Sequence, residues 1–122
     1  MALEGVRVID MTIWQQGPVA TAMLADMGAE VIKIEERQHG DPGRYSDNVD
    51  QEGNRFPLSF YFESNNRDKK SVAINLKTEA GREVLYRLVK KSDVFASNFR
   101  KKALERLGLD YPVLRQHNPR LI

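Results

Sequence analysis

The fold is decided by residues 6–35, VRVIDMTIWQQGPVATAMLADMGAEVIKIE. Val6–Met11 is a short run rich in β-branched residues, which is typical of a strand. Gly17-Pro18 favours a helix start, and apolar residues then recur at helical spacing until Gly28, which suits a left-handed helix cap. Glu30–Glu35 is a second strand-like run. The stretch therefore predicts a βαβ unit with parallel strands and a right-handed crossover.

The alternation of strand and helix continues downstream. Ser71–Leu76 alternates apolar and polar residues and predicts a third strand, and Val94–Phe99 predicts a fourth. Between them, Thr78 suits the N-cap of a helix that runs to Ser92. Repeated strand–helix units indicate an α/β fold, with a doubly wound, mostly parallel, Rossmann-like sheet and flanking helices.

Two further helices are expected before the chain ends. Arg100–Leu107 predicts a short helix that Gly108 ends, and Asp110 begins another that stops before Pro119. The apolar pair Leu121-Ile122 resembles the start of a fifth strand. We therefore expect residues 1–122 to be a truncated N-terminal part of a larger α/β domain.

A long connection interrupts the pattern between residues 37 and 66, and connections of this length are often functional or disordered. Its turn formers are Gly40, Asp41, Pro42, Gly43, Asn48, Gly53, Asn54 and Pro57. The apolar patch Phe56–Phe62 is expected to dock on the protein, as a short helix.

Composition narrows the class of protein. With 41% hydrophobic and 30% charged residues, the chain of 122 residues fits one soluble globular domain. The absence of cysteine excludes disulfides, thiolate catalysis and cysteine-ligated metals. No apolar run has the length of a signal peptide or a membrane span, so we expect a cytoplasmic protein with no membrane partner.

The charge pattern points to a small anion more than to nucleic acid. The net charge is only +2, and no basic–aromatic repeat is present, so nucleic-acid binding is a remote alternative. The basic residues gather in Arg67–Lys70 and in Arg100–Lys102. Such clusters are most often solvated faces, but two clusters at predicted strand ends suggest an anionic ligand.

Ligands of open α/β sheets bind beyond the carboxyl ends of the strands, and the segment after the fourth strand is the best candidate there. Asn98 offers a donor and an acceptor, Phe99 offers a face for stacking, and Arg100 can hold a phosphate in a bidentate fork. Arg106 could add a second cation. A solvated helix start with Phe99 in the core is the alternative.

Other strand ends favour ordinary structural roles. The turn around Trp14 and Gly17 lacks the Gly-x-Gly-x-x-Gly pattern and a P-loop lysine, which disfavours a dinucleotide or P-loop site. Glu35-Glu36-Arg37 could hold a ribose hydroxyl, although surface charge is the more common explanation. Asp10 is expected to be structural and Trp14 to be packed. Neither histidine has a partner at metal-ligand spacing, so no catalytic constellation and no metal site are expected.

Several motifs in the same order resemble class III CoA-transferases, a family that includes formyl-CoA transferase, carnitine CoA-transferases and α-methylacyl-CoA racemase. The resemblance runs over nearly the whole chain. It is carried by Leu3–Asp10, Gly17-Pro18, Leu24–Glu35, Gly40-Asp41, Arg44, Asn66–Lys77, Gly81-Arg82, Asp93, Asn98–Arg100, Leu104–Gly108 and Asn118–Ile122. This chain departs from the family at Lys101-Lys102, where relatives usually have a Pro-Gly turn. Asp68 and Lys70 replace the commoner asparagine and arginine, and Glu36 stands where many relatives have a basic or neutral residue.

The resemblance implies a site for coenzyme A or acyl-CoA, bound as a substrate. Trp14, Gln15 and Gln16 match the loop near the thioester, and Ile74 and Lys77 match positions near the adenine and its phosphates. A further run of CoA contacts matches Asn98, Phe99, Arg100, Ala103 and Arg106.

The resemblance also implies the reaction. CoA moves between carboxylic acids through an aspartate that attacks the acyl-CoA thioester, and family members form interlocked homodimers. That aspartate lies downstream of this segment, so we expect the segment alone to be inactive. Two alternatives stay open. One is an acyl-CoA racemase of the same family, and the other is a non-catalytic nucleotide-binding or interaction module.

Overall fold

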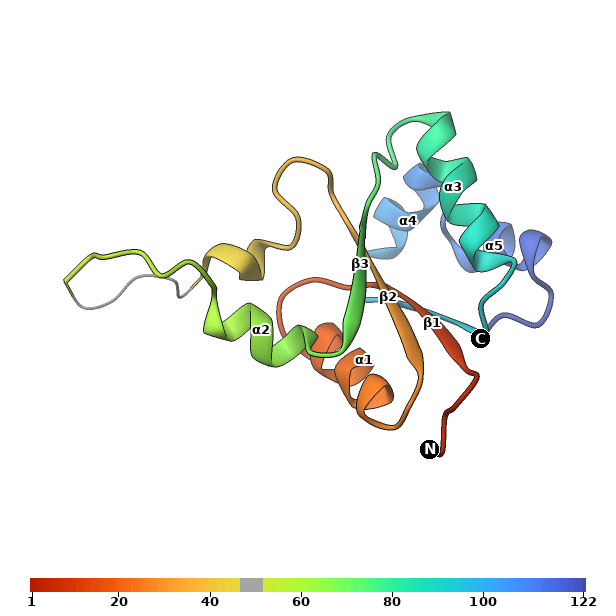
Figure 1. Ribbon diagram of the computed structural model, residues 1–122. Helices are drawn as coiled ribbons and strands as arrows, with labels where there is room; N and C mark the ends of the chain where they lie inside the picture. The colour runs from red at the N-terminus through yellow and green to blue at the C-terminus, as the bar shows by residue number, and fades with distance from the viewer. Residues whose placement is uncertain (47–51) are drawn as a thin grey trace.

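The protein is a four-stranded parallel sheet covered by helices on both faces (Figure 1). The computed structural model describes residues 1–46 and 52–122. The strand order is β3-β2-β1-β4. The strands are β1 (Arg7–Met11), β2 (Glu30–Glu35), β3 (Lys69–Ala73) and β4 (Val94–Ser97). This arrangement confirms the expected α/β class.

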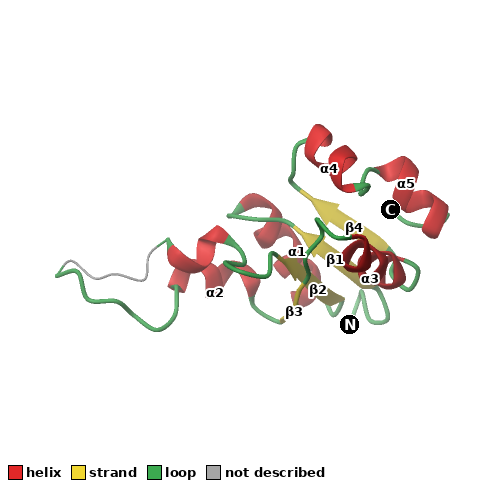
Figure 2. Ribbon diagram, turned by 90° about the horizontal axis from the view of Figure 1, so that it is seen from above, coloured by secondary structure: helices red, strands yellow, loops and turns green. Residues whose placement is uncertain are grey.

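The helices form two layers (Figure 2). They are α1 (Gln16–Asp26), α2 (Phe60–Asn66), α3 (Glu79–Val89), α4 (Lys101–Leu107) and α5 (Tyr111–His117), with a 3-10 turn η1 (Pro42–Tyr45). Helices α1 and α2 lie on one side of the sheet, and α3, α4 and α5 lie toward the other. No helix in the described part of the chain is both long and apolar enough to cross a membrane.

The layer between the sheet and α3, α4 and α5 is apolar. Because side chains alternate along a strand, Ile9 and Met11 of β1 face this layer, together with Ile32 and Ile34 of β2. Buried residues from the helices and loops complete it: Ile74, Leu85, Val89, Leu109, Leu114 and Leu121. Burial of these side chains supplies the main stabilisation of the fold, at roughly 25 cal/mol per Å² of apolar surface.

The layer between the sheet and α1 contains buried charges. Val8 and Val31 pack against small alanines there, but the next inward positions are Asp10 and Lys33. Asp10 accepts hydrogen bonds from Thr21 of α1 and from Lys69 of β3, each at 2.8 Å. Burial lowers the pKa of Lys69, and its contact with Asp10 opposes that shift. These contacts confirm the structural role expected for Asp10.

Three local signals at helix ends are confirmed, whereas α1 begins at Gln16, just before Gly17-Pro18, and α3 ends at Val89 rather than at Ser92. The Thr78 hydroxyl accepts the N–H of Gly81 at 3.1 Å, so Thr78 is the N-cap of α3. Gly28 and Gly108 end α1 and α4 with φ of 100° and 68°, a backbone conformation that glycine adopts without strain. Gly17 is needed for a different reason: a Cβ there would lie 2.5 Å from Cβ of Thr12, so only glycine lets α1 start this close to β1.

The third strand is the main correction to the expected elements. It spans Lys69–Ala73 rather than residues 71–76, because Lys69 pairs with Val31 of β2 and buries its side chain against Asp10. The fourth strand is also shorter than expected and ends at Ser97.

The apolar patch 56–62 docks only in part. Phe62 is buried, but Phe56, Leu58 and Phe60 are 40%, 59% and 66% exposed. A short helix does form, although it starts at Phe60, after the N-cap Ser59. The expected turn residue Asn48 lies outside the described residues.

The expected fifth strand is not assigned as a strand. Ile122 nevertheless donates its N–H to the Asp93 carbonyl at 3.0 Å and accepts the N–H of Phe95 at 2.9 Å. This pair of bonds follows the pattern of a parallel ladder beside β4.

Candidate functional site

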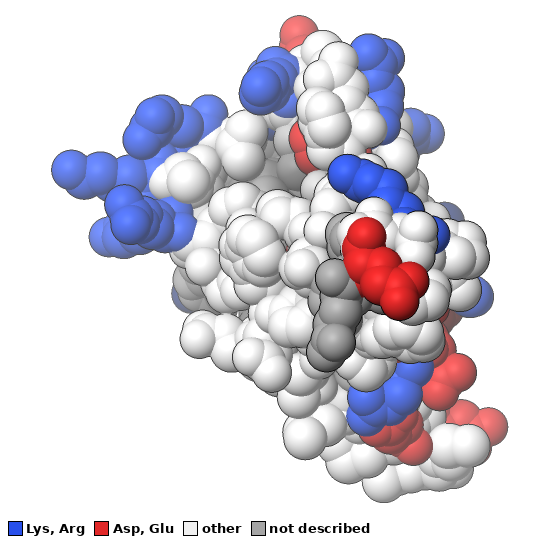
Figure 3. Space-filling model, turned by 90° about the vertical axis from the view of Figure 1, so that its left-hand side faces the viewer, with Lys and Arg blue, Asp and Glu red and all other residues white. Residues whose placement is uncertain are grey.

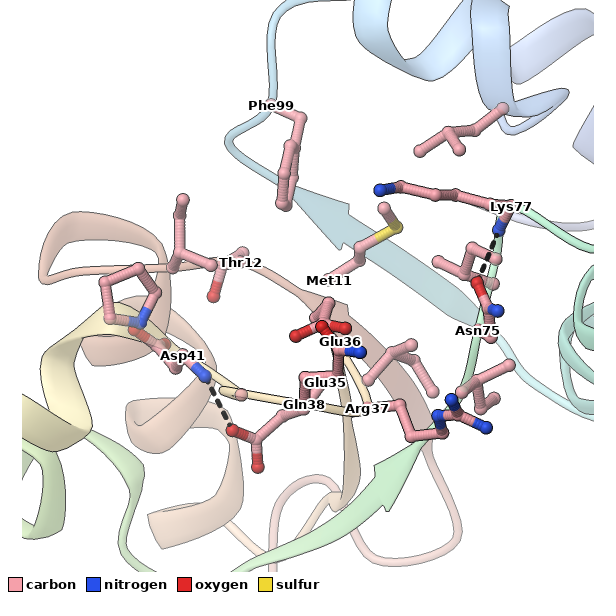
Figure 4. Close-up of a pocket in the computed structure, with 17 residues that line it drawn as sticks. Met11, Thr12, Glu35, Glu36, Arg37, Gln38, Asp41, Asn75, Lys77 and Phe99 are labelled. Atoms are coloured by element: carbon pink, nitrogen blue, oxygen red, sulfur yellow. Dashed lines mark hydrogen bonds between the residues drawn. The ribbon is translucent and has the colours of Figure 1, made fainter.

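A cavity of about 440 Å³ opens beyond the carboxyl ends of the strands (Figure 4). Segments that follow all four strands line it: Met11, Thr12, Ile13, Ile34, Glu35, Glu36, Arg37, Gln38, Gly40, Asp41, Pro42, Ile74, Asn75, Leu76, Lys77, Phe99 and Leu107. Its position is the one that open parallel sheets use for ligands, and its volume is in the range of small-molecule sites.

Apolar side chains form much of the cavity wall, while charged side chains lie at its rim, so the two regions suit different parts of a ligand. Met11, Ile34, Ile74 and Leu107 supply an apolar surface, and the ring of Phe99 faces the same space. Such a surface suits a flat, weakly polar group such as a nucleobase.

Cations lie at the rim of the cavity. Lys77 and Arg37 are exposed, and neither has an ion-pair partner among the described residues. Figure 4 shows the Lys77 side chain reaching across the opening toward the Phe99 side. The rim can therefore attract a phosphate, while the interior accepts the apolar part of the same ligand.

Glu35 is a buried carboxylate in the wall with several donors. Arg44 donates from Nε to Oε1 at 2.9 Å and from Nη2 to Oε2 at 2.6 Å. The Ser71 hydroxyl and the Asp41 N–H donate as well, at 2.5 and 2.9 Å. Burial alone raises the pKa of Glu35, but these hydrogen bonds outweigh it and lower the pKa from 4.5 to about 2. Because its oxygens are occupied by these donors, Glu35 is a fixed structural anion, not a reacting group.

The loop between β1 and α1 is held by side chains from other segments. Asn98 accepts the Ile13 N–H at 3.0 Å and donates to the Ile13 carbonyl at 2.7 Å. Asp41 accepts the Trp14 N–H at 3.3 Å. Trp14 has φ of 66°, which is uncommon for a residue with a bulky side chain. The tertiary contacts therefore maintain a backbone conformation that the loop would not favour alone.

Three of the ten residues named from the sequence line the cavity. These are Ile74, Lys77 and Phe99. The other seven do not: Trp14, Gln15, Gln16, Asn98, Arg100, Ala103 and Arg106. Asn98 has a positioning contact with Ile13, and Arg106 donates to the Lys102 carbonyl at 3.3 Å. Trp14 is 50% exposed, so the expectation that it is packed is wrong.

The two basic clusters differ in their surroundings. In the first, Arg67, Lys69 and Lys70 pair with Asp26, Asp10 and Glu30. In the second, Arg100 and Lys102 are exposed and have no ion-pair partner among the described residues, while Lys101 lies 3.8 Å from Glu105. Figure 3 shows Lys and Arg side chains gathered at the upper left of one face, with no Asp or Glu among them. Only the second cluster is therefore available to an anion.

One whole wall of the cavity is not predicted by the sequence patterns. Six of the seven residues from 36 to 42 line it, although their residue types indicate turns and surface charge. The signal that points to this wall is its place directly after β2, at the carboxyl edge of the sheet. Glu35 is in fact buried.

The described residues hold no group of three or more His, Asp or Glu side chains placed to bind a metal ion. The chemistry of the site is that of a binding pocket with an apolar interior and a cationic rim, and its buried carboxylates are paired with Arg44 and Lys33.

The sequence of this chain is similar to those of known CoA-transferases. Formyl-CoA:oxalate CoA-transferase of Streptomyces coelicolor is 42% identical over 123 residues, which are 99% of this chain and 28% of that protein. Acetyl-CoA:oxalate CoA-transferase of Acetobacter aceti is 43% identical over 120 residues, which are 98% of this chain and 29% of that protein.

Solved structures show the same fold. Rv3272 from Mycobacterium tuberculosis has a TM-score of 0.88 at 43% identity over 98% of this chain, which is 32% of that chain. A CAIB/BAIF family protein from Brucella suis has a TM-score of 0.86 at 39% identity, over 98% of this chain and 31% of its own.

The chain spans less than a third of the length of these curated relatives. The family model described as CoA-transferase family III matches residues 3–122, almost the whole sequence. With an α/β sheet, a cavity at its carboxyl edge and this match, the chain belongs to CoA-transferase family III.

Proposed function

We propose that this chain is the CoA-binding segment of an enzyme that moves CoA between carboxylic acids. The observation that carries the proposal is the cavity at the carboxyl edge of the sheet, with Phe99 and aliphatic side chains inside and Lys77 at its rim. Relatives at 42% and 43% identity are named as CoA-transferases, which supports the same substrate class here.

The nucleotide end of CoA fits this cavity best. An adenine ring would bury its faces against Phe99 and Ile74, and its phosphates would lie toward Lys77 and Arg37 at the rim. Charge-assisted hydrogen bonds are worth about 1.5–3 kcal/mol each, so two of them with the buried ring would support micromolar affinity. The exposed basic start of α4, at Arg100, would attract the remaining phosphates from solution.

The catalytic group is proposed to lie outside this segment. Within the cavity wall, the buried carboxylates of Glu35 and Asp41 are paired with Arg44 and Lys33 and cannot approach a thioester without losing those partners. The third carboxylate, Glu36, is exposed and accepts the His39 N–H at 2.8 Å. In the whole protein, we propose that the nucleophile is an aspartate outside these 122 residues. The substrates would be an acyl-CoA and a free carboxylic acid, and the assembly would be a homodimer. The segment by itself would bind CoA without transferring an acyl group.

The test is calorimetric titration of the chain with CoA and with two fragments of CoA. We expect adenosine 3′,5′-bisphosphate to compete with CoA and pantetheine not to compete, because the cavity holds the nucleotide end. Lys77→Ala should weaken CoA binding about tenfold or more, the equivalent of one charge-assisted hydrogen bond.

The matched control is Lys90→Ala, which removes an exposed lysine at the end of α3 that does not line this cavity. It should leave the affinity unchanged. If the wild-type chain does not bind CoA, or if Lys77→Ala and Lys90→Ala have equal effects, the proposed site is wrong.

A further inference from the structure

Lys33 and Asp41 form an ion pair under the cavity wall that is 1% exposed on both sides, with Nζ and Oδ2 2.8 Å apart. Removing two charges from water costs free energy that their mutual attraction barely offsets, so a buried pair of this kind contributes little net stability. Its retention in the core is better explained by what its two members hold in place.

Each member of the pair contacts a different wall segment. Lys33 donates from Nζ to the Thr12 carbonyl at 2.8 Å, in the loop after β1. Asp41 belongs to the loop after β2, where its Oδ1 accepts the Gly43 N–H at 2.8 Å. The same Oδ1 accepts the Trp14 N–H at 3.3 Å, which joins the second loop directly to the first.

The two joined segments lie on the same side of the cavity. Figure 4 shows Thr12 and Asp41 near each other at its left, opposite Lys77. Residues 11–13 and 40–42 all line the cavity. A shift of one loop relative to the other would therefore change the shape of the space that a ligand occupies.

The first loop also needs an external restraint. Trp14 adopts φ of 66°, and its side chain is half exposed and is not part of the buried core. A bulky residue remains in the left-handed region only where its surroundings over-determine the backbone. The contacts from Lys33 and Asp41 to residues 12 and 14, with those from Asn98 to Ile13, provide that restraint.

We propose that Lys33 and Asp41 are positioning residues, whose ion pair holds the β1–α1 loop and the β2–η1 loop in the relative position that the CoA site requires. The inference rests on the proposed function, because it concerns the same cavity. The charged groups of Lys33 and Asp41 are proposed to contact each other and the loops, and not the ligand.

The test removes both charges together, in the double variant Lys33→Met/Asp41→Asn. No lone charge stays buried, and the new side-chain amide keeps an oxygen that can accept the Trp14 N–H. We expect the double variant to be about as stable as the wild type in urea unfolding, because neutral replacements of buried pairs are often tolerated. We expect its affinity for CoA to fall about tenfold, because the hydrogen bond from Lys33 to Thr12 and the ion pair between Lys33 and Asp41 are lost, which leaves the bond to the Trp14 N–H as the remaining link between the loops.

Lys70→Met is the control. Lys70 lies in the same sheet, in β3, and forms an ion pair with Glu30 at 2.6 Å, and neither residue lines the cavity. This variant should keep wild-type affinity. A double variant that binds CoA as well as the wild type would show that the pair has a structural role only.

A second readout does not depend on CoA. Trp14 is the sole tryptophan, so its fluorescence reports on the β1–α1 loop directly. We expect a shifted emission maximum and faster amide exchange at residues 12–16 in the double variant, but not in Lys70→Met. Failure of the wild type to bind CoA would overturn the proposed function alone, whereas unchanged emission and exchange in the double variant would overturn the positioning role.

Discussion

At the scale of single residues, Glu35 shows how a buried charge organises the cavity wall. Its carboxylate holds Arg44 from η1, Ser71 from β3 and the backbone N–H of Asp41. Arg44 also lies over the ring of Phe62, 3.8 Å from its centroid, which connects the wall to α2. The carboxylate of Glu35 thus helps to hold the loop after β2, together with the ion pair of Asp41 and Lys33.

The lowered pKa of Glu35 predicts a pH dependence of stability. Glu35 titrates at about 2 in the folded protein and near 4.5 when unfolded. A lowered folded pKa contributes stability above the unfolded pKa, and that contribution is lost as the pH falls from about 5 toward 2. Glu35→Gln should therefore cost about 2–3 kcal/mol at pH 7, and its deficit relative to the wild type should shrink below pH 5.

Urea unfolding of both proteins at pH 7, 5 and 3 measures this effect. Glu36→Gln, at the exposed neighbouring position, serves as the control and should keep most of the wild-type slope between pH 5 and 3. If Glu35→Gln retains the full wild-type pH dependence, another carboxylate is responsible for it.

At the scale of elements, the start of α3 is packed directly against the cavity wall. Gly81 lies in the first turn of α3, and a Cβ at this position would overlap the carbonyl oxygen of Asn75. Asn75 lines the cavity, and its side chain accepts the N–H of Lys77 at 3.2 Å. The close approach of helix to strand end therefore sets the position of Lys77.

Gly81→Ala tests this coupling between helix and site. The added methyl group cannot be accommodated without moving α3 or residues 75–77, so we expect a loss of about 1–3 kcal/mol, as in other overpacked sites. We also expect weaker binding of CoA in calorimetric titration, because Lys77 moves with Asn75.

Glu83→Ala is the control for that substitution. It introduces the same residue at an exposed position of the same helix, where alanine favours the helix and nothing is crowded. Equal affinities for Gly81→Ala and Glu83→Ala would show that the start of α3 does not position the site.

At the scale of the whole molecule, the cavity belongs to no single element. Its lining comes from the ends of all four strands and from α4, through Leu107. Parallel strands bring their carboxyl ends to one edge of the sheet, so segments far apart in the sequence meet there. A ligand in this cavity would therefore restrain several distant segments at once.

Amide hydrogen exchange with and without CoA measures that restraint. We expect slower exchange at residues 11–13, 36–42, 74–77 and 99–107 when CoA is bound. Binding at 100 times the Kd should also raise the free energy of unfolding by about 2.7 kcal/mol, from mass action alone.

The C-terminal half of α3, residues 84–89, serves as the internal control, because it does not line the cavity. Its exchange should change only through the global rise in stability. Protection confined to the start of α4 would place CoA on the basic surface and not in the cavity.

The sequence by itself determined the order of the elements and many of their ends. Strand and helix periodicities are local properties of the chain, as are the cap at Thr78 and the glycines at 28 and 108, and the structure confirms them. The alternating order of strands and helices predicts the α/β class of the fold, and it predicts that a ligand site lies at the carboxyl edge of the sheet. Phe99 could be named because it lies at the end of the fourth predicted strand, whereas Ile74 and Lys77 are named only through the resemblance to the family.

Only the tertiary structure decided which charges are buried and which segments face the cavity. Lys69 looked like part of a surface cluster, but strand register places it against Asp10, which is 59 residues away in sequence. Asp41 looked like a turn residue, yet its partner is Lys33 of β2. Ion pairing and register between distant segments depend on packing in three dimensions, so no local pattern of residue types reveals them.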